Sequence, residues 1–247
     1  MKISALVLIK NEQDMIEEAL SQLEFADEII VLDQGSTDNT VQLAKKFTKN
    51  IARTKIEDFG KNRNTLAQMA KGQWLLYVDA DERFSLQTQA QIKNAVKSGQ
   101  YSAYYFPREN YILGQNLKHG GWSPDYVPRL FKKADLIGWS GKVHETPEVS
   151  GSFGHLNAPI IHRTARSLNL MLAKSIKWAQ IEAQLNFKAN SPKVNSFKVL
   201  RLCGQEFLKR YILALGFLDG KVGFIAALYQ ALHQAMVLVY LWELQND

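Results

Sequence analysis

The sequence predicts an α/β fold in which helices cover both faces of a mostly parallel β-sheet, followed by a helical extension at the C-terminus. In the first hundred residues, short apolar runs of strand length alternate with segments whose apolar residues recur every three or four positions. This alternation is typical of parallel sheets, because each crossover helix returns the chain to the same edge. From residue 167 the pattern is helical to the end. We therefore expect a sheet domain over residues 1–165 and a helical extension over residues 166–247.

Each element has its own pattern. The expected strands of the first half are residues 4–9, 28–32, 51–55 and 73–78, and the helices between and after them are 11–23, 41–47, 61–70 and 86–96. After residue 101 the pattern changes to short strands at 104–107, 111–113 and 127–131, with a polar, glycine-rich loop at 114–125. The tail predicts helices at 167–187, 197–215 and 222–244.

The stretch QWLLYVDADER, which begins at Gln73, carries the strongest chemical signal. Its apolar run, typical of a buried strand, ends in Asp79 and Asp81, with Glu82 next to them. Ligands of open α/β sheets bind at the carboxyl ends of the strands, and residues i and i+2 of an extended segment point the same way. Two converging carboxylates repel each other unless a cation lies between them. We therefore expect Asp79 and Asp81 to hold Mg²⁺ or Mn²⁺ with a diphosphate, the alternative being a helix cap.

Composition narrows the classes of partner. The net charge of +6 over 247 residues favours anionic partners such as nucleotide diphosphates or phospholipid surfaces. No basic run is interleaved with aromatic residues, so a nucleic-acid partner is not expected. The single cysteine, Cys203, excludes an internal disulfide and a cysteine-based metal site, which fits a cytosolic protein. The N-terminal apolar run is too short for a secretory signal, and we interpret it as the first strand.

Two common nucleotide-binding motifs are missing. The first strand is followed by Lys10, Asn11 and Glu12 in place of a GxGxxG fingerprint, and the chain contains no GxxxxGK[ST] sequence. Dinucleotide-dependent dehydrogenases and P-loop NTPases are therefore disfavoured. A bound nucleotide would have to be held by side chains and a metal.

The last predicted helix is long enough to cross a membrane, but Gln230, His233 and Gln234 lie near its middle. Aromatic residues, upstream basic residues and an apolar face suit a helix pair that lies on an anionic membrane surface. The alternatives are helices that only pack on the sheet domain, or a true membrane span. We favour the interfacial helix pair.

Four motifs, in order, resemble glycosyltransferase family 2. They are Asn11-Glu12, Asp33-Gln-Gly-Ser-Thr-Asp38, Lys61-Asn-Arg63-Asn64 and Asp79-Ala-Asp81. Further segments are similar to bacterial lipopolysaccharide-core glycosyltransferases, in particular the β-1,4-glucosyltransferase type: Trp122-Ser-Pro-Asp125, Arg129-Leu-Phe131, Val143-His-Glu145, Gly216-Phe-Leu-Asp-Gly220 and Leu241-Trp-Glu243. The resemblance implies a Rossmann-like GT-A fold and transfer of glucose from a UDP-linked donor to a lipid-anchored saccharide.

Several residues of these motifs are expected to bind the sugar-nucleotide donor. Asp33 ends a strand and is expected to accept a hydrogen bond from a uracil N–H, an Asx-turn being the alternative. Asn11 and Glu12 are expected to contact the base or ribose, or else only begin a helix. Arg63 offers a fork of donors for a phosphate or the base edge. Asp81 is the expected metal ligand, with Asp79 facing the ribose or sharing the metal.

The transfer step needs neutralisation of the leaving diphosphate and a base for the acceptor hydroxyl. Arg129 and His144 are expected to assist the leaving group, and His144 is also a candidate third metal ligand. Glu145 is the expected base, with Asp125 the second candidate and a surface carboxylate the plain alternative for each. A single displacement would invert the configuration at the sugar.

The acceptor is expected to be a lipid-anchored saccharide at the cytoplasmic face of the plasma membrane, and Trp122, Tyr126 and Trp139 are candidates for stacking on sugar rings. Two other classes of function remain open. A sugar-phosphate nucleotidyltransferase has a similar sheet but usually a glycine-rich basic loop after the first strand. A non-catalytic lipid- or glycan-binding module would show no metal dependence and no transfer.

Overall fold

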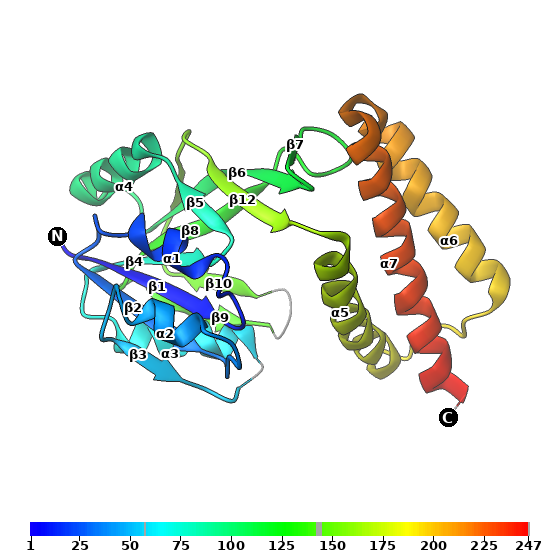
Figure 1. Ribbon diagram of the computed structural model, residues 1–247, viewed down its shortest axis with the longest axis horizontal. Helices are drawn as coiled ribbons and strands as arrows, with labels where there is room; N and C mark the ends of the chain where they lie inside the picture. Colours follow the sequence, from blue (N-terminus) through cyan, green and yellow to red (C-terminus); the bar gives the residue numbers. More distant parts are fainter. Residues whose placement is uncertain (57, 142–144, 247) are drawn as a thin grey trace. The chain divides into compact units, whose positions relative to one another are not determined.

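The computed structural model describes residues 1–56, 58–141 and 145–246, which pack as two compact units (Figure 1). The sheet unit comprises Met1–Arg108 and Tyr126–His162. The helical unit comprises Glu109–Asp125 and Arg163–Asp247, so the polar loop packs with the tail helices. The domain boundary after residue 165 stays a prediction, because compact packing does not show which piece folds alone.

Four parallel strands form the first half of the sheet, in the order β3-β2-β1-β4. Their bounds are β1 (Ile3–Ile9), β2 (Glu28–Asp33), β3 (Ile51–Arg53) and β4 (Trp74–Asp79). The register sets Ile9 opposite Asp33 and Leu8 opposite Asp79, so both acidic residues lie at the same carboxyl edge, on either side of β1. The predicted parallel strands are confirmed here.

The second half of the sheet is antiparallel, so the sheet is mixed rather than mostly parallel. The order continues β8-β6-β12-β5, with β8 antiparallel to both β4 and β6, and β12 antiparallel to β5. The connection from β6 to β8, residues 113–125, contains no crossover helix of the kind that parallel neighbours need. The bounds are β5 (Glu82–Phe84), β6 (Ala103–Ile112), β8 (Tyr126–Lys132) and β12 (Ile160–Ala165).

Several short strands were not expected from the sequence. β7 (Gln115–Leu117) pairs antiparallel with β6 inside the predicted polar loop, β11 (Phe153–His155) pairs parallel with β6, and β9 (Leu136–Ser140) pairs with β10 (Thr146–Val149). The two expected strands at 104–107 and 111–113 are one strand, β6. Three- to five-residue strands carry too little periodicity to be recognised without their partners.

The helices of the sheet unit are α1 (Ile16–Ser21), α2 (Thr40–Ala44), α3 (Phe59–Met69) and α4 (Leu86–Ser98). The Asp58 side chain caps α3 by accepting the Lys61 N–H, and Ser85 caps α4 in the same way. Alternate residues of β1 face opposite ways into two cores. One core contains Val7 with residues of α1 and α4, and the other contains Leu6 with Leu66 of α3.

The helical unit contains α5 (Leu168–Lys188), α6 (Ser196–Leu208) and α7 (Gly220–Asn246), joined after α6 by the π-turn Lys209–Leu213 and the 3₁₀ turn Gly216–Asp219. α7 packs against both α5 and α6. Polar contacts join α7 to α5, where the Ser175 and Tyr229 hydroxyls lie 2.6 Å apart and His233 Nε2 lies 3.4 Å from Glu182. Residues Gly216–Asn246 are long and apolar enough to cross a membrane by length and composition alone, and a third of the most apolar window is buried.

Candidate active site

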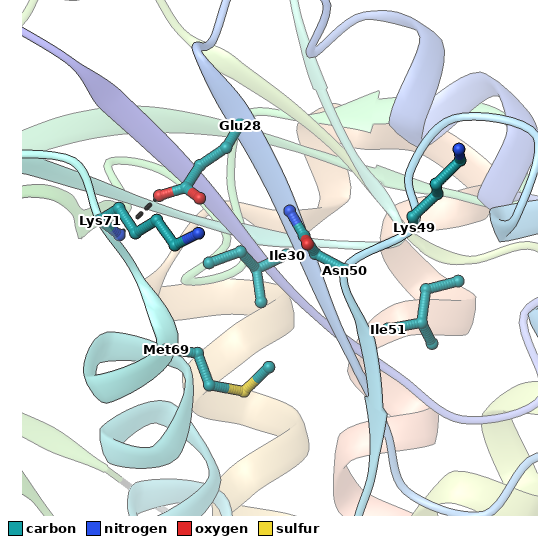
Figure 2. A pocket seen from close by; sticks show the side chains of 7 residues that line it. All are labelled: Glu28, Ile30, Lys49, Asn50, Ile51, Met69 and Lys71. Atoms are coloured by element: carbon teal, nitrogen blue, oxygen red, sulfur yellow. Dashed lines mark hydrogen bonds between the residues drawn. The ribbon is translucent and has the colours of Figure 1, made fainter.

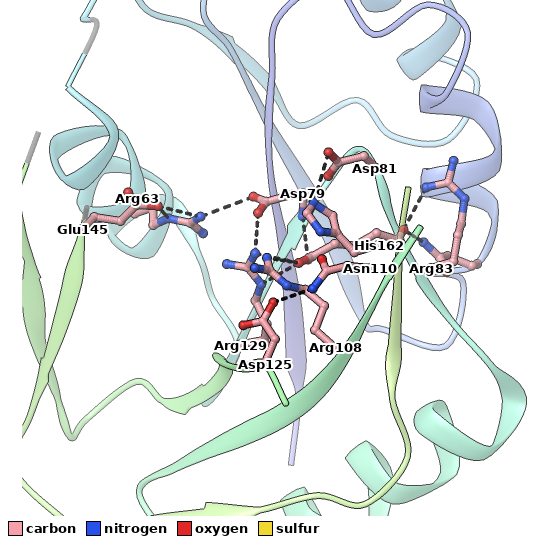
Figure 3. Close-up of polar contacts among 12 residues, drawn as sticks. Arg63, Asp79, Asp81, Arg83, Arg108, Asn110, Asp125, Arg129, Glu145 and His162 are labelled. Atoms are coloured by element: carbon pink, nitrogen blue, oxygen red, sulfur yellow. Dashed lines mark hydrogen bonds and ion pairs between the residues drawn. The ribbon is translucent and has the colours of Figure 1, made fainter. Parts of the chain in front are cut away.

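Asp79, the last residue of β4, lies between two buried arginines (Figure 3). Its Oδ1 is 3.3 Å from Arg63 Nη2, and its Oδ2 accepts a hydrogen bond from Arg129 Nη2. Arg63 comes from α3 and Arg129 from β8, so three elements converge on one carboxylate. The cations that balance Asp79 here are guanidinium groups.

Glu82 is a buried member of this cluster that contacts both Arg129 and Asp79. Its side chain is fully buried, its Oε1 accepts hydrogen bonds from Arg129, and its Oε2 accepts the backbone N–H of Asp79 at 3.1 Å. Arg108 Nη1 lies 3.9 Å from the same carboxylate. A buried carboxylate is tolerated only when it is paired and hydrogen-bonded, so Glu82 fixes the position of Arg129 relative to Asp79.

The guanidinium group of Arg63 contacts two carboxylates at its edges and two aromatic rings on its flat face. Its Nε donates to Glu145 Oε1 at 3.0 Å, and its guanidinium carbon lies 4.9 Å from the Trp139 ring centroid and 5.4 Å from that of Tyr77. Asn64 exchanges two hydrogen bonds with the backbone of Trp139, which fastens β9 to α3. Arg63, the residue of α3 before Asn64, thereby links the predicted base, Glu145, to Asp79.

The electrostatics follow from this packing. Burial alone would raise the pKa of Asp79, but the adjacent Arg129 and Arg63 outweigh it and hold that pKa well below its usual range. Burial works against the charge of Arg129, yet Asp79 and Glu82 raise its pKa above the ordinary arginine value. Burial raises the pKa of Tyr77, whose hydroxyl donates to the backbone carbonyl of Arg63. Asp79 and Arg129 are therefore both ionised at neutral pH, and Tyr77 is neutral.

Asp81 points to a different partner. Ala80 and Asp81 form a turn, so the extended backbone from which we expected Asp79 and Asp81 to converge is not present. Asp81 Oδ2 lies 3.3 Å from Nε2 of His162, a half-exposed acid against a buried imidazole. Arg83 fixes the turn by donating to the carbonyl oxygens of Ala80 and Glu82.

Asp33 lies at the same edge of the sheet and is buried. Its Oδ1 accepts the N–H of Ser36, three residues further along the chain, and its Oδ2 accepts Arg53 Nε at 2.8 Å. Asn11 adopts φ 55° and bridges to the same loop, where its N–H donates to Ser36 and its Oδ1 accepts the Thr37 N–H. The loops after β1 and β2 thus form one connected rim.

The remaining predicted residues are distributed differently. The Glu12 N–H donates to Thr40 Oγ1, so its backbone belongs to the same rim. Asp125 belongs to the helical unit, where its Oδ2 accepts Asn110 Nδ2 at 2.8 Å. His144 lies outside the described residues. Trp139 is buried among Tyr77 and Phe131, whereas Tyr126 is exposed at the start of β8.

Sequence reasoning missed two residues of this region. Glu82 stands in the acidic motif itself, and its place after a buried strand was a usable signal. His162 had no such signal, because it follows Asp81 by some eighty residues without a motif. It reaches the site because β12 pairs with β5, with His162 opposite Glu82.

The side chains around Asp81 are of the kinds that bind a divalent cation. A carboxylate and an imidazole already lie within 3.3 Å of each other at the rim of the sheet. Among the described residues no group of three or more histidine, cysteine, aspartate or glutamate side chains could enclose an ion. Mg²⁺ and Mn²⁺ in nucleotide sites usually have few protein ligands and complete their shell with phosphate oxygens and water. Asp81 and His162 therefore fit an ion that arrives with a diphosphate.

A shallow pocket lies at the opposite, amino edge of the sheet and contains none of the predicted site residues (Figure 2). Its lining residues are Glu28, Ile30, Lys49, Asn50, Ile51, Met69 and Lys71. Burial alone would raise the pKa of Glu28, but hydrogen bonds from Ser4 and from the N–H groups of Lys71 and Gly72 lower it. Glu28 therefore fastens the start of β2 to the turn before β4, a structural role.

Comparison with known proteins identifies the family and the fold of the chain. The chain is 23% identical over 256 residues to an uncharacterized glycosyltransferase of Rickettsia conorii, which covers 98% of this chain and 90% of the relative. It is 27% identical over 146 residues to the glycosyltransferase SunS of Bacillus subtilis, covering 57% and 33% of the two chains. The structure of S. aureus TarS residues 1–349 with UDP-GlcNAc has a TM-score of 0.53 at 16% identity, covering 100% and 91%. The fold is therefore GT-A-like, as the sequence predicted. Residues 4–153 match the model of glycosyl transferase family 2, and the chain belongs to that family.

Proposed function

We propose that this glycosyltransferase is an inverting, divalent-metal-dependent enzyme that transfers glucose from a UDP-linked donor to a lipid-anchored saccharide, the lipopolysaccharide inner core. The observation that carries the proposal is that Arg63 and Arg129 both pair with Asp79 at the carboxyl edge of the parallel strands, while Arg63 also pairs with Glu145. Cations for a diphosphate and a carboxylate for a hydroxyl proton are thereby gathered at one rim. The complex of S. aureus TarS, which has a similar fold, with UDP-GlcNAc supports a uridine nucleotide as the donor.

The donor nucleotide would lie along the rim formed by the loops after β1 and β2. Asp33, Asn11 and Glu12 would face the base and ribose, and Asp79 the ribose. Arg63 and Arg129 would meet the diphosphate, for which planar guanidinium groups are well suited. Both arginines are buried and already fixed by carboxylates, so little side-chain entropy would be lost when the donor binds.

Asp81 and His162 are the residues that would hold the cation, with His144 a further candidate. A bound divalent ion supplies Lewis-acid neutralisation of the leaving diphosphate. The protein's own contribution is to keep the arginines charged and aligned, because stabilisation by preorganised charges costs no reorganisation during the reaction.

The transfer itself is a single displacement at the anomeric carbon. The acceptor oxygen forms a bond to that carbon, the bond from the carbon to the diphosphate oxygen breaks, and the hydroxyl proton passes to a carboxylate. Glu145 is the proposed base, because Arg63 fixes its carboxylate at 3.0 Å. Asp125, oriented by Asn110, is the second candidate. An α-linked donor would give a β-glycoside.

The acceptor and the location rest on the helical unit. This unit contains twelve lysine and arginine residues against seven aspartate and glutamate residues, whereas the sheet unit contains eighteen against seventeen. Most of the net positive charge therefore lies with the tail helices, which also expose apolar side chains. This supports a peripheral enzyme on the anionic cytoplasmic face of the plasma membrane.

A thermal-shift panel tests the donor and the metal together. UDP, UDP-glucose, UDP-GlcNAc and GDP-linked sugars are each added with and without Mn²⁺, since a ligand that binds only the native state raises the unfolding temperature. We expect the largest rise with UDP-glucose plus Mn²⁺, and a loss of that extra rise in Asp81→Ala. A rise with GDP-sugars only, or one independent of the metal, would contradict the proposed donor or the proposed cation. Transfer to lipopolysaccharide core acceptors, followed by NMR of the new linkage, then tests inversion.

A further inference from the structure

The connection between α6 and α7, residues 209–221, displays large apolar side chains at its surface. We call it the hairpin tip. Leu213 is 79% exposed and Leu218 is 56% exposed, values far above those of leucines that belong to a core. The exposed large apolar residues of the tip are Ile212, Leu213, Leu215, Phe217 and Leu218. Five large apolar side chains exposed within seven consecutive residues indicate a binding region for a partner or a membrane.

The polar groups of the tip are bonded to the neighbouring loop at residues 118–120, and the large apolar side chains remain at the surface. The buried carboxylate of Asp219 accepts the backbone N–H groups of Lys118 and His119 and lies 3.0 Å from Nδ1 of His119. The Gly120 N–H donates to the carbonyl of Ala214, and Arg210 donates to the carbonyl of Gly120. The loop at 118–120 therefore satisfies the polar groups of the tip from one side.

Glycines make this frame tight. A Cβ atom on Gly223 would lie 2.0 Å from the carbonyl oxygen of Gly216, and one on Gly216 would lie 2.7 Å from the carbonyl oxygen of Arg210. Backbone segments pack directly on each other at the tip, as the ribbon of α6 and α7 shows (Figure 1). The apolar side chains are therefore presented by a folded frame, which lowers the entropy cost of inserting them into another phase.

Charge decides which partner this surface fits. Exposed Lys209 and Lys221 stand at the two ends of the tip, and exposed Lys118 comes from the adjoining loop. The one acidic residue of the tip, Asp219, is buried against His119, and Glu206 at the end of α6 pairs with Arg210 at 2.5 Å. Apolar side chains ringed by lysines match the boundary between acyl chains and anionic headgroups.

We propose that the hairpin tip inserts into the headgroup region of an anionic phospholipid bilayer, with Leu213 and Leu218 reaching the acyl chains and the lysines meeting lipid phosphates. The inference rests on the membrane location given under Proposed function and names the segment that makes the contact. It differs from α6 and α7 lying flat, in which the exposed stripe of α7, containing Leu228, Leu232 and Val239, would enter the lipid first.

Site-specific labelling distinguishes the two modes, because the chain has a single cysteine. In a Cys203→Ser background, an environment-sensitive fluorophore is attached at Leu213→Cys, Leu218→Cys, Leu232→Cys or Leu86→Cys. Leu86 is the matched control, a leucine 84% exposed in the sheet unit. Each labelled protein is mixed with vesicles of phosphatidylglycerol and phosphatidylcholine, or of phosphatidylcholine alone, and quenched by lipid-borne nitroxide or by aqueous iodide.

When phosphatidylglycerol is present, and only then, we expect the fluorescence of labels at 213 and 218 to increase and to be quenched by nitroxide lipid. Labels at 232 and 86 should remain quenched by aqueous iodide. Protection at 232 with the tip labels left in water would overturn the tip and leave the membrane location standing. Failure of the unlabelled protein to bind any vesicle would overturn both the tip insertion and the membrane location. Absence of transfer despite vesicle binding would count against the proposed enzyme function alone.

Substitution gives an independent measurement. The double variant Leu213→Asp/Leu218→Asp should weaken vesicle binding at least about tenfold, since two apolar side chains no longer leave water and two negative charges oppose the headgroups. Leu86→Asp should leave binding unchanged. Equal vesicle binding by the double variant would overturn the proposal, as would a concentration-dependent dimer that the double variant abolishes, because a second copy would then cover the tip.

Discussion

In the sheet unit, charged side chains lie inside and pair with one another, whereas at the hairpin tip of the helical unit large apolar side chains lie outside. Arg129 and Glu82 are buried against each other near Asp79. Leu213 and Leu218 are exposed on a frame whose own acid, Asp219, is buried. Both arrangements go against the usual distribution of residues between core and surface. The buried charges are tolerated because they pair with one another. The proposed sugar-nucleotide donor and the proposed lipid bilayer are the partners that would account for the two arrangements.

The difference also concerns what holds each region. Around Asp79 the contacts are between side chains from α3, β4, β8 and the residue before β10, so removal of one ion leaves another uncompensated. At the tip the contacts go mainly to backbone groups of residues 118–120, so the frame depends on Asp219 and on close glycine contacts. Substitutions should therefore affect stability more in the first region than in the second.

The largest effect is expected for Glu82→Ala. Loss of this buried carboxylate leaves Arg129 with one partner fewer in a desolvated site, which should lower the free energy of unfolding by about 3–5 kcal/mol. Urea unfolding followed by circular dichroism measures it. Glu17→Ala, which removes the exposed ion pair with Lys46, is the control and should change stability by less than about 1 kcal/mol. Equal effects of the two variants would mean that the buried cluster is not a unit of stability.

Glu145→Gln tests the chemistry of the same cluster without removing it. The glutamine can still accept from Arg63, so the fold and donor affinity should persist, while the rate of transfer should fall at least about 100-fold for want of a base. Single-turnover transfer and donor thermal shifts give the two quantities. Glu148→Gln, an exposed carboxylate in β10, is the matched control with unchanged rate. A normal rate in Glu145→Gln would move the role to Asp125.

Asp219→Ala addresses the helical unit. The variant loses hydrogen bonds from the N–H groups of Lys118 and His119, and bonds to a charged acceptor are worth about 1.5–3 kcal/mol. We expect a smaller loss of stability than in Glu82→Ala, together with faster amide exchange confined to residues 115–120. Hydrogen exchange by mass spectrometry checks the location. Exchange that quickens across the sheet strands instead would show that the tip is not a separate element.

The smallest effect is expected from the titration of Asp33. Burial raises its pKa, but hydrogen bonds from Ser36 and Arg53 outweigh burial and hold the pKa below its ordinary value. Between the folded and unfolded values the unfolded chain binds more protons, so this contribution is complete above about pH 4 and is lost as pH falls further. Asp33→Asn should therefore flatten the acid limb of the stability curve. An acid limb identical to that of the wild type would contradict this assignment.

Much of the fold was predictable because its signals are local. The four parallel strands, their helices and the three tail helices occur where they were predicted, although α1 begins five residues later and α6 ends seven residues earlier than expected. The antiparallel half was not predictable in that way, because strands such as β5 and β11 have only three residues and depend on distant partners. The prediction that the backbone is extended from Asp79 to Asp81 was wrong for a related reason. Arg83 stabilises a turn there by donating hydrogen bonds to backbone carbonyl groups.

By itself, the sequence determined that an acidic motif follows a buried strand at the carboxyl edge of a parallel sheet, because strand length, apolar run and motif order are all properties of neighbouring residues. Only the tertiary structure decided which groups meet those acids. Arg63 and Arg129 stand 16 and 50 positions from Asp79, and His162 joins Asp81 through the pairing of β12 with β5. Such contacts depend on how distant segments fold together, and no local pattern in the chain encodes them.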